Sequence, residues 1–170
     1  NLFCSTGNSS TASVTTVVLP ANILVLGTNL TPIAISNLTP VVSHGTDFGS
    51  AQVAWGVLTN TFTITNSGPG TLILSNNVTI AEANASDFTV VAQPSLTVAS
   101  SNVTTFKIAF DPLATGTRSA TVFITNNVDG RNPYPFAIQG TGVRGQNVRF
   151  QGAEGSTNDN WSFRSTPGSG

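Results

Sequence analysis

Long stretches of this sequence alternate apolar and polar residues with a period of two. In the segment 57–66, Leu58, Phe62 and Ile64 share one face and threonines occupy the other. This alternation is typical of a half-buried antiparallel strand. The same kind of pattern follows in four further segments, which are separated by turn residues: 86–91, 103–110, 118–126 and 134–140.

Strand signals spaced roughly 8–12 residues apart, without helical periodicity, are typical of β-sandwiches. Their apolar faces carry Phe, Ile, Val and Leu, which can interdigitate between two sheets. The sequence therefore predicts an all-β fold, a two-sheet antiparallel β-sandwich.

The first 46 residues contain no Asp, Glu, Lys or Arg. Within them, Ala12–Leu19 and Asn22–Leu26 predict two short strands, ended by Pro20 and Gly27. Both segments are apolar on both faces, which indicates strands that are buried against something. We expect residues 1–31 to form an uncharged N-terminal strand segment, of which residues 12–26 have no evident partner in the domain that follows. Residues 144–170 are expected to form one more strand, at 147–151, and a Gly/Ser-rich tail or the start of a next module.

Composition excludes several classes of partner. Only 8% of the residues are charged, against about 25% in ordinary soluble domains. Thr, Ser and Asn make up 60 of the 170 residues, while 39% hydrophobic residues suffice for a packed core and exclude charge-driven disorder. A net charge of −1 with one lysine gives no basic surface for nucleic acid or anionic lipid. No apolar run reaches the length that spans a bilayer.

The sequence contains no Met and a single Cys. Without Met the chain cannot begin at its own start codon, so we expect a processed protein or a piece of a longer one. Cys4 alone allows neither an intrachain disulfide nor a multi-cysteine metal site.

Candidate catalytic residues are sparse. His44 and Asp47 lie three residues apart among many serines, but no G-x-S-x-G nucleophile motif is present, and a lone His in a loop is more often a surface residue. The seven acidic residues do not cluster in the sequence. We therefore predict no catalytic, cofactor-binding or metal-binding residues and no enzyme activity.

Three further features have a functional interpretation and also a simple structural one. The run 126–130 resembles a fragment of a Ca²⁺ loop, but hairpin-turn chemistry explains the same residues. Lys107, the only lysine, suggests a self-formed isopeptide bond, yet alternation points it outward. Trp55, Phe123 and Trp161 could form an exposed aromatic set for sugars, although core or inter-domain packing is the more common role of such residues.

A series of blocks in residues 32–143 resembles the bacterial choice-of-anchor D modules, relatives of the ASH immunoglobulin-like domains. The blocks that carry this resemblance are 32–35, 45–49, 61–72, 86–90, 105–112, 116–122 and 132–142. The resemblance implies an immunoglobulin-like sandwich of seven or eight strands in large secreted or surface proteins. It implies no catalytic residue. The tail, with Phe150–Gly152 and Asp159–Trp161, is similar to the opening of a following β-rich module in such proteins.

These observations favour a non-enzymatic structural module of a bacterial secreted or cell-surface protein: a stalk, an adhesin or a filament subunit. We expect its partners to be other copies of itself or neighbouring modules, through strand addition by residues 12–26. The alternative is a carbohydrate-binding or adhesive recognition module, which predicts an exposed aromatic cluster. A hydrolase would need His44 in a cleft beside a serine and an acid.

Overall fold

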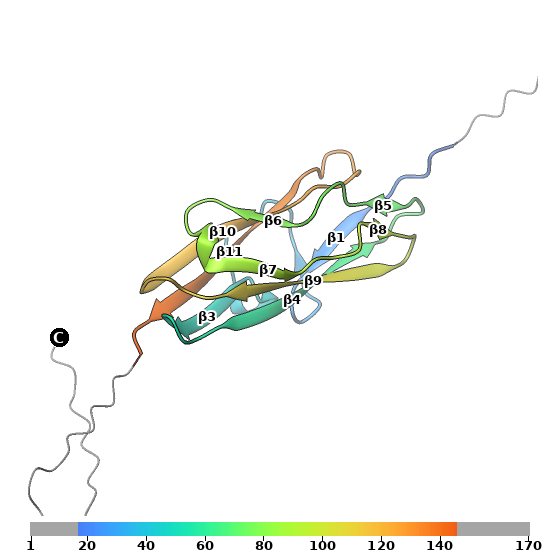
Figure 1. Cartoon of the computed structure of the whole chain (residues 1–170). Coiled ribbons are helices and arrows are strands. Elements are labelled where there is room, and N and C mark those ends of the chain that lie inside the picture. Colours follow the sequence, from blue (N-terminus) through green and yellow to red (C-terminus); the bar gives the residue numbers. More distant parts are fainter. Residues whose placement is uncertain (1–16, 146–170) are drawn as a thin grey trace, which may run out of the picture.

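The alternating segments form the long strands of two packed sheets in the computed structural model, which describes residues 17–145 (Figure 1). Between these limits the chain forms eleven strands and two short 3-10 helices. Their bounds are β1 Ile23–Leu26, β2 Pro32–Ile33, η1 Val42–His44, β3 Asp47–Gln52, β4 Leu58–Asn66, β5 Leu72–Ile73, β6 Thr79–Ala81, η2 Ala85–Asp87, β7 Phe88–Ala92, β8 Thr97–Val98, β9 Val103–Phe110, β10 Gly116–Ile124 and β11 Tyr134–Val143.

The strands form two main sheets and one small pair. The first sheet has the order β2-β1-β4-β9-β7, the second has the order β3-β11-β10-β6, and β5 pairs with β8. All pairings between strands are antiparallel except that of β3 with β11, which is parallel. The prediction of an all-β, immunoglobulin-like sandwich is confirmed, with this one parallel pairing as an addition.

Phenylalanines from both sheets fill the core. Phe62 of β4 and Phe106 of β9 lie opposite each other in register, with their rings stacked at 5.3 Å. Phe62 also contacts Phe136 of β11, across the sandwich, at a ring distance of 5.7 Å. Each of the three side chains is at most 1% exposed. Such offset and tilted aromatic pairs stabilise a core beyond the burial of area alone.

The predicted faces of the long strands are confirmed. In β10, Val122 and Ile124 are buried and alternate with half-buried Thr121 and Phe123, as the period of two requires. Two details differ from the prediction. The strand expected from Ser86 begins two residues later, at Phe88, because η2 occupies Ala85–Asp87. Ala109, expected on the outer face, is only 8% exposed, since this small residue lies between threonines of both neighbouring strands.

The N-terminal part of the chain has partners that the sequence did not reveal. Strand β1 pairs with β4 on one side and with β2 on the other, so that Val25 lies opposite both Ile64 and Ile33. The expectation that residues 12–26 lack a partner in the same domain is therefore wrong for Ile23–Leu26, and the range 32–143 leaves out a strand of the sandwich. Apolar residues on both faces indicated burial correctly, but they did not say which surface buries them.

The segment before β1 is different. Val17, Val18 and Leu19 are exposed and belong to no strand. The rest of the predicted strand at 12–19 and the predicted strand at 147–151 lie outside the described residues. Within residues 17–145, no helix is long and apolar enough to cross a membrane.

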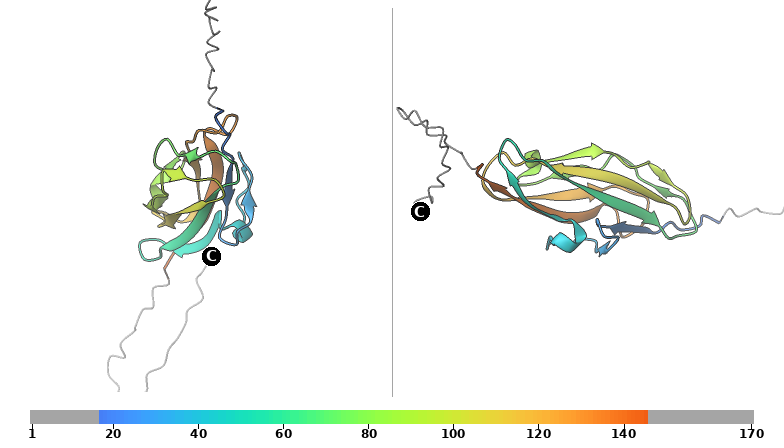
Figure 2. Two further views of the ribbon diagram at one scale, coloured as in Figure 1. Left: turned by 90° about the vertical axis from the view of Figure 1, so that its right-hand side faces the viewer. Right: turned by 90° about the horizontal axis from the view of Figure 1, so that it is seen from below.

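The chain comes in at one end of the elongated sandwich and leaves at the other (Figures 1 and 2). Ile23, at the start of β1, lies opposite Asn66 at the end of β4, beside the turn 67–70. Val143, at the end of β11, lies opposite Gln52 beside the turn 53–57. We call these the leading end and the trailing end.

Candidate functional site

The two residues considered for catalysis, His44 and Asp47, are not hydrogen-bonded to each other. Asp47 accepts a hydrogen bond from the backbone N–H of Gly49 at 2.8 Å and another from Gln139 Nε2 at 2.8 Å, one on each carboxylate oxygen. His44 ends η1, and its buried Nδ1 atom has no hydrogen-bond partner among the described residues. The Asp47 carboxylate therefore fastens β3 to β11 and is not positioned to orient the imidazole.

The possible Ca²⁺ loop has the contacts of a turn. Asn126, 1% exposed, accepts a hydrogen bond from the N–H of Val128 at 2.9 Å and donates to the carbonyl of Arg131 at 2.7 Å. Gly130 adopts a left-handed φ of +68°, and its N–H donates to Asp129 Oδ1. Among the described residues, no three His, Cys, Asp or Glu side chains lie close enough to hold one metal ion. Turn formation accounts for the oxygens of this loop.

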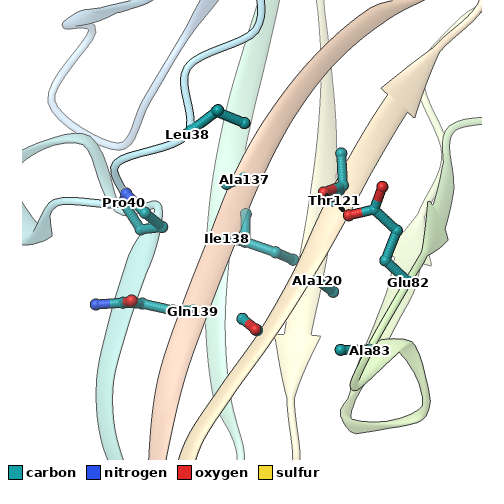
Figure 3. Close-up of a pocket in the computed structure, with 10 residues that line it drawn as sticks. Leu38, Pro40, Glu82, Ala83, Ala120, Thr121, Ala137, Ile138 and Gln139 are labelled. Atoms are coloured by element: carbon teal, nitrogen blue, oxygen red, sulfur yellow. Dashed lines mark hydrogen bonds between the residues drawn. The ribbon is translucent and has the colours of Figure 1, made fainter.

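A groove of about 260 Å³ runs over the outer face of the β10–β11 pair (Figure 3). Leu38 and Pro40 form one wall, and Glu82 forms part of the other. Two polar side chains of the groove are already engaged, because the Glu82 carboxylate accepts from Thr121 and the Gln139 amide donates to Asp47. Ligand sites usually need several free polar groups that converge, and the engagement of these two side chains argues against such a site here.

The aromatic residues considered for sugar binding do not lie together. Trp55 is 86% exposed in the turn at the trailing end, so it does not pack in the core of this sandwich, while packing between domains stays a prediction. Phe123 is half-buried on β10 and pairs with Pro135 toward the leading end. Trp161 lies outside the described residues. Lys107 is exposed, as the alternation predicted.

The best-built polar arrangement fastens the incoming chain at the leading end. Asn66, at the end of β4, is fully buried, and its side chain makes four hydrogen bonds. The amide nitrogen donates to the carbonyls of Gly70 at 2.7 Å and Val98 at 3.0 Å, and Oδ1 accepts from the N–H groups of Asn22 and Gly68, both at 3.1 Å. Both donors and both acceptor positions of the amide are therefore used. One side chain thus joins the strand that comes in, the turn that follows β4 and the small β5–β8 pair.

Two glycines allow the incoming chain to lie against that turn. A Cβ atom on Gly70 would lie 1.9 Å from the carbonyl oxygen of Leu19, and one on Gly68 would lie 2.6 Å from Pro20 O. Left-handed backbone angles do not explain glycine here, because neither residue is among those with positive φ. The physical reason is a close approach of two backbones, which only glycine permits.

A second set of contacts reaches the same end from the loop between β10 and β11. Arg131 Nη1 donates to the carbonyl of Ile23 in β1 at 2.8 Å. Asn127 accepts from the N–H of Ile73 at 2.9 Å and donates to the carbonyl of Thr71 at 3.1 Å, as a neighbouring strand would. The leading end is therefore held from both sheets, although composition alone had suggested only turns here.

The trailing end is held by a buried ion pair and by close packing. Asp87, 1% exposed in η2, pairs with Arg118 of β10. A Cβ atom on Gly142 of β11 would lie 2.0 Å from the carbonyl oxygen of Ala114, so the last strand presses on the loop between β9 and β10. Neither feature could be read from the sequence, since the partners are 31 and 28 positions apart.

Comparison with known proteins agrees with the fold. No family model and no curated protein matches the chain. Among solved structures, a protein of unknown function from Porphyromonas gingivalis matches with 17% identity and a TM-score of 0.52, over 75% of this chain and 49% of that one. An ASH/PapD-like domain of human CEP192 matches with 11% identity and a TM-score of 0.47, over 85% and 100%. The VesB protease of Vibrio cholerae matches with 15% identity and a TM-score of 0.42, over 63% and 30%.

At these identities the similarities concern the fold alone. The chain spans about half of the Porphyromonas protein and less than a third of VesB. The class of protein defined here is an immunoglobulin-like β-sandwich module. Membership in the choice-of-anchor D group remains a prediction.

Proposed function

We propose that this chain is a non-enzymatic structural module of a bacterial secreted or cell-surface protein, which keeps the parts before and after it apart and in line. The observation that carries the proposal is the position of the two ends. The chain comes in at Asn22 and leaves at Val143, at opposite ends of the long axis (Figure 2). A module connected in this way adds its full length to a stalk.

The terminal strands are also suited to carry tension. Strand β1 lies between β2 and β4, and β11 lies between β3 and β10, so neither is at the edge of its sheet. A pull on the two ends acts along both strands. Because ladder hydrogen bonds run across the strands, such a pull loads many of them at once in shear. The contacts of Asn66 and Arg131 add to the resistance at the leading end.

Single-molecule pulling tests this role. Cys4, the only cysteine, serves as one handle, and Gly170→Cys or Asp129→Cys supplies the other. The first pair pulls along the long axis. The second pulls between the incoming chain and a loop at the same end, which opens pairings one after another. We expect a clearly higher unfolding force for the Cys4–Gly170→Cys pair. Equal forces along the two axes would contradict the load-bearing role.

The placement outside the cell is tested separately. Protease treatment of intact cells of the source bacterium should remove the protein if it is displayed at the surface, and culture medium should contain it if it is secreted. Protein that is found only in the soluble fraction after lysis would refute this part of the proposal. The resemblance of residues 32–143 to modules of secreted and surface proteins is what supports this placement.

Strand addition between copies is the finer form of the proposal, with a narrower donor than the sequence suggested. Ile23–Leu26 is already paired on both sides, so we assign the donor role to residues 12–19. Val17, Val18 and Leu19 are exposed apolar residues, as a donor strand requires. Deleting residues 12–19 should lower the assembly state in sedimentation while β1 remains in place. An unchanged sedimentation coefficient distribution would refute strand addition.

A further inference from the structure

The turn between β3 and β4 holds a tryptophan in solvent at a cost in backbone strain. Trp55 is 86% exposed. The residue before it, Ala54, has a left-handed φ of +67°, a conformation that costs a non-glycine residue about 1–2 kcal/mol. The N–H groups of Trp55 and Gly56 both donate to the carbonyl of Gln52, at 3.3 Å and 2.9 Å. A strained conformation that is held by its surroundings is a reason to look for function.

Two more apolar side chains are exposed at the same end. Val57 is 58% exposed and Leu113 is 64% exposed. The turn and the loop that carry them adjoin, because Leu58 at the start of β4 lies opposite Phe110 at the end of β9. We call Trp55, Val57 and Leu113 the trailing surface. Tryptophan is the residue type most enriched among residues that dominate binding energy in interfaces.

The chain leaves the sandwich beside this surface. The N–H of Val53 donates to the carbonyl of Val143 at 3.0 Å, and a Cβ atom on Gly145 would lie 3.7 Å from Gln52 Oε1. The residues after Gly145 therefore start next to the Trp55 turn. Twenty-five residues follow in this chain, and they include the large apolar side chains of Trp161 and Phe163.

We propose that the trailing surface is the docking site for the part of the same chain that follows Gly145. The partner is specified by connection: a segment joined by a short link is present at a local concentration in the millimolar range, which a separate molecule rarely reaches. Trp55 then fixes the direction in which the next part of the protein leaves the sandwich. This inference rests on the proposed spacer role and deepens it, since a module that sets direction makes a stiffer stalk than one on a free hinge.

The two tryptophans of the chain permit a direct test. In the full 170-residue chain, Trp161→Phe leaves Trp55 as the only tryptophan and keeps an aromatic ring at 161. Acrylamide quenching and the emission maximum of this variant report on the exposure of Trp55. We expect quenching several-fold slower than for N-acetyltryptophanamide, with a blue-shifted emission. Both should be independent of protein concentration.

A cut after folding identifies what covers Trp55. A protease site inserted after Gly145 is cleaved in the folded protein, and the released tail is removed. Quenching should then rise to the value of N-acetyltryptophanamide, while the far-ultraviolet circular dichroism of the sandwich stays unchanged. Unchanged quenching after the cut would refute the docking of the tail.

Three other outcomes would also overturn the inference. If Trp55 in the uncut chain is quenched as fast as N-acetyltryptophanamide, the trailing surface is uncovered. Protection that grows with protein concentration means that a second copy covers it. Protection that appears only when oligosaccharides are added means that it is a sugar site. The first outcome leaves the spacer role intact, because the pulling experiment decides that role independently.

Discussion

Replacing Asn66 with alanine should be among the most damaging single changes at the leading end. The substitution removes four hydrogen bonds from a fully buried side chain and leaves two backbone N–H groups and two carbonyls without these partners. Each such bond contributes about 1 kcal/mol net, and a buried group left unpaired costs about 1–3 kcal/mol. Relaxation and water entry satisfy some of the freed groups. The free energy of unfolding should therefore fall by about 3–5 kcal/mol, which is a large part of the 5–15 kcal/mol typical of a domain.

Equilibrium unfolding in urea measures this loss. With a slope of about 1–3 kcal/mol per molar urea, the midpoint should fall by roughly 2 M. Asn102→Ala is the matched control, because Asn102 lies at the same end but is exposed. This control should change the free energy of unfolding by no more than about 0.5 kcal/mol.

Asn66→Asp separates hydrogen bonding from the loss of volume. This variant keeps the shape but places an oxygen where the amide nitrogen donated to the carbonyls of Gly70 and Val98. Ionisation of the new carboxyl group is opposed both by burial and by these two oxygens, which raises its pKa in the folded state. Such a group binds a proton more tightly when folded, so stability should increase as the pH falls below neutrality. If Asn66→Ala costs no more than Asn102→Ala, or Asn66→Asp is equally stable at pH 5 and pH 7, the reasoning about this site is wrong.

Three further predictions concern other parts of the sandwich. Asp87→Asn should lower the free energy of unfolding by about 2–4 kcal/mol in urea titrations. The substitution leaves the Arg118 guanidinium, only 20% exposed, without its buried partner. A loss below about 1 kcal/mol would show that the ion pair does not stabilise the fold. Burial raises the pKa of Tyr134, the only tyrosine, above the usual 10.0, against smaller opposite effects of Arg131 and a backbone hydrogen bond. The phenol proton is therefore held more tightly in the folded state, so stability should stay level up to about pH 10 and fall above it. Tyr134→Phe should remove most of this alkaline loss of stability. An equal loss in both proteins would show that Tyr134 is not its cause. Gly70→Ala should destabilise the protein by about 2 kcal/mol or more, because its Cβ atom clashes with a backbone oxygen. Gly130→Ala, at φ +68° with nothing within 4 Å, should cost about 1–2 kcal/mol. Thermal melts that rank the two variants the other way round would refute the close-approach argument.

Much of the fold could be predicted because the residue types along a half-buried strand show which of its faces is buried. In β4, β9, β10 and β11 each residue faces either the core or the outside, and the alternation of apolar and polar residues follows directly. The outward position of Lys107 could be predicted for the same reason. Short strands such as β2 and β8 have only two residues each. Two residues cannot show a period, so the pattern did not reveal them.

Other features depend on segments that are far apart in the sequence. Nothing local distinguishes Asn66 from the sixteen other asparagines, because its role comes from Asn22, Gly70 and Val98 meeting around it. The parallel pairing of β3 with β11 joins residues about 90 positions apart. The exposure of Trp55 could not be decided from the sequence either, because a turn sequence does not show what lies beside it.

The alternation along single strands thus determined the class of fold and the inner and outer faces of the long strands, and composition alone showed the scarcity of charge. Strand pairing decided that Ile23–Leu26 belongs inside the sandwich. It also decided that the chain comes in and leaves at opposite ends and that one buried amide fastens the leading end. The physical reason is that burial on one face of a strand produces an alternation that is visible in the sequence itself. The partner of a hydrogen bond or of a close backbone contact is determined only when distant segments pack together in the folded sheets.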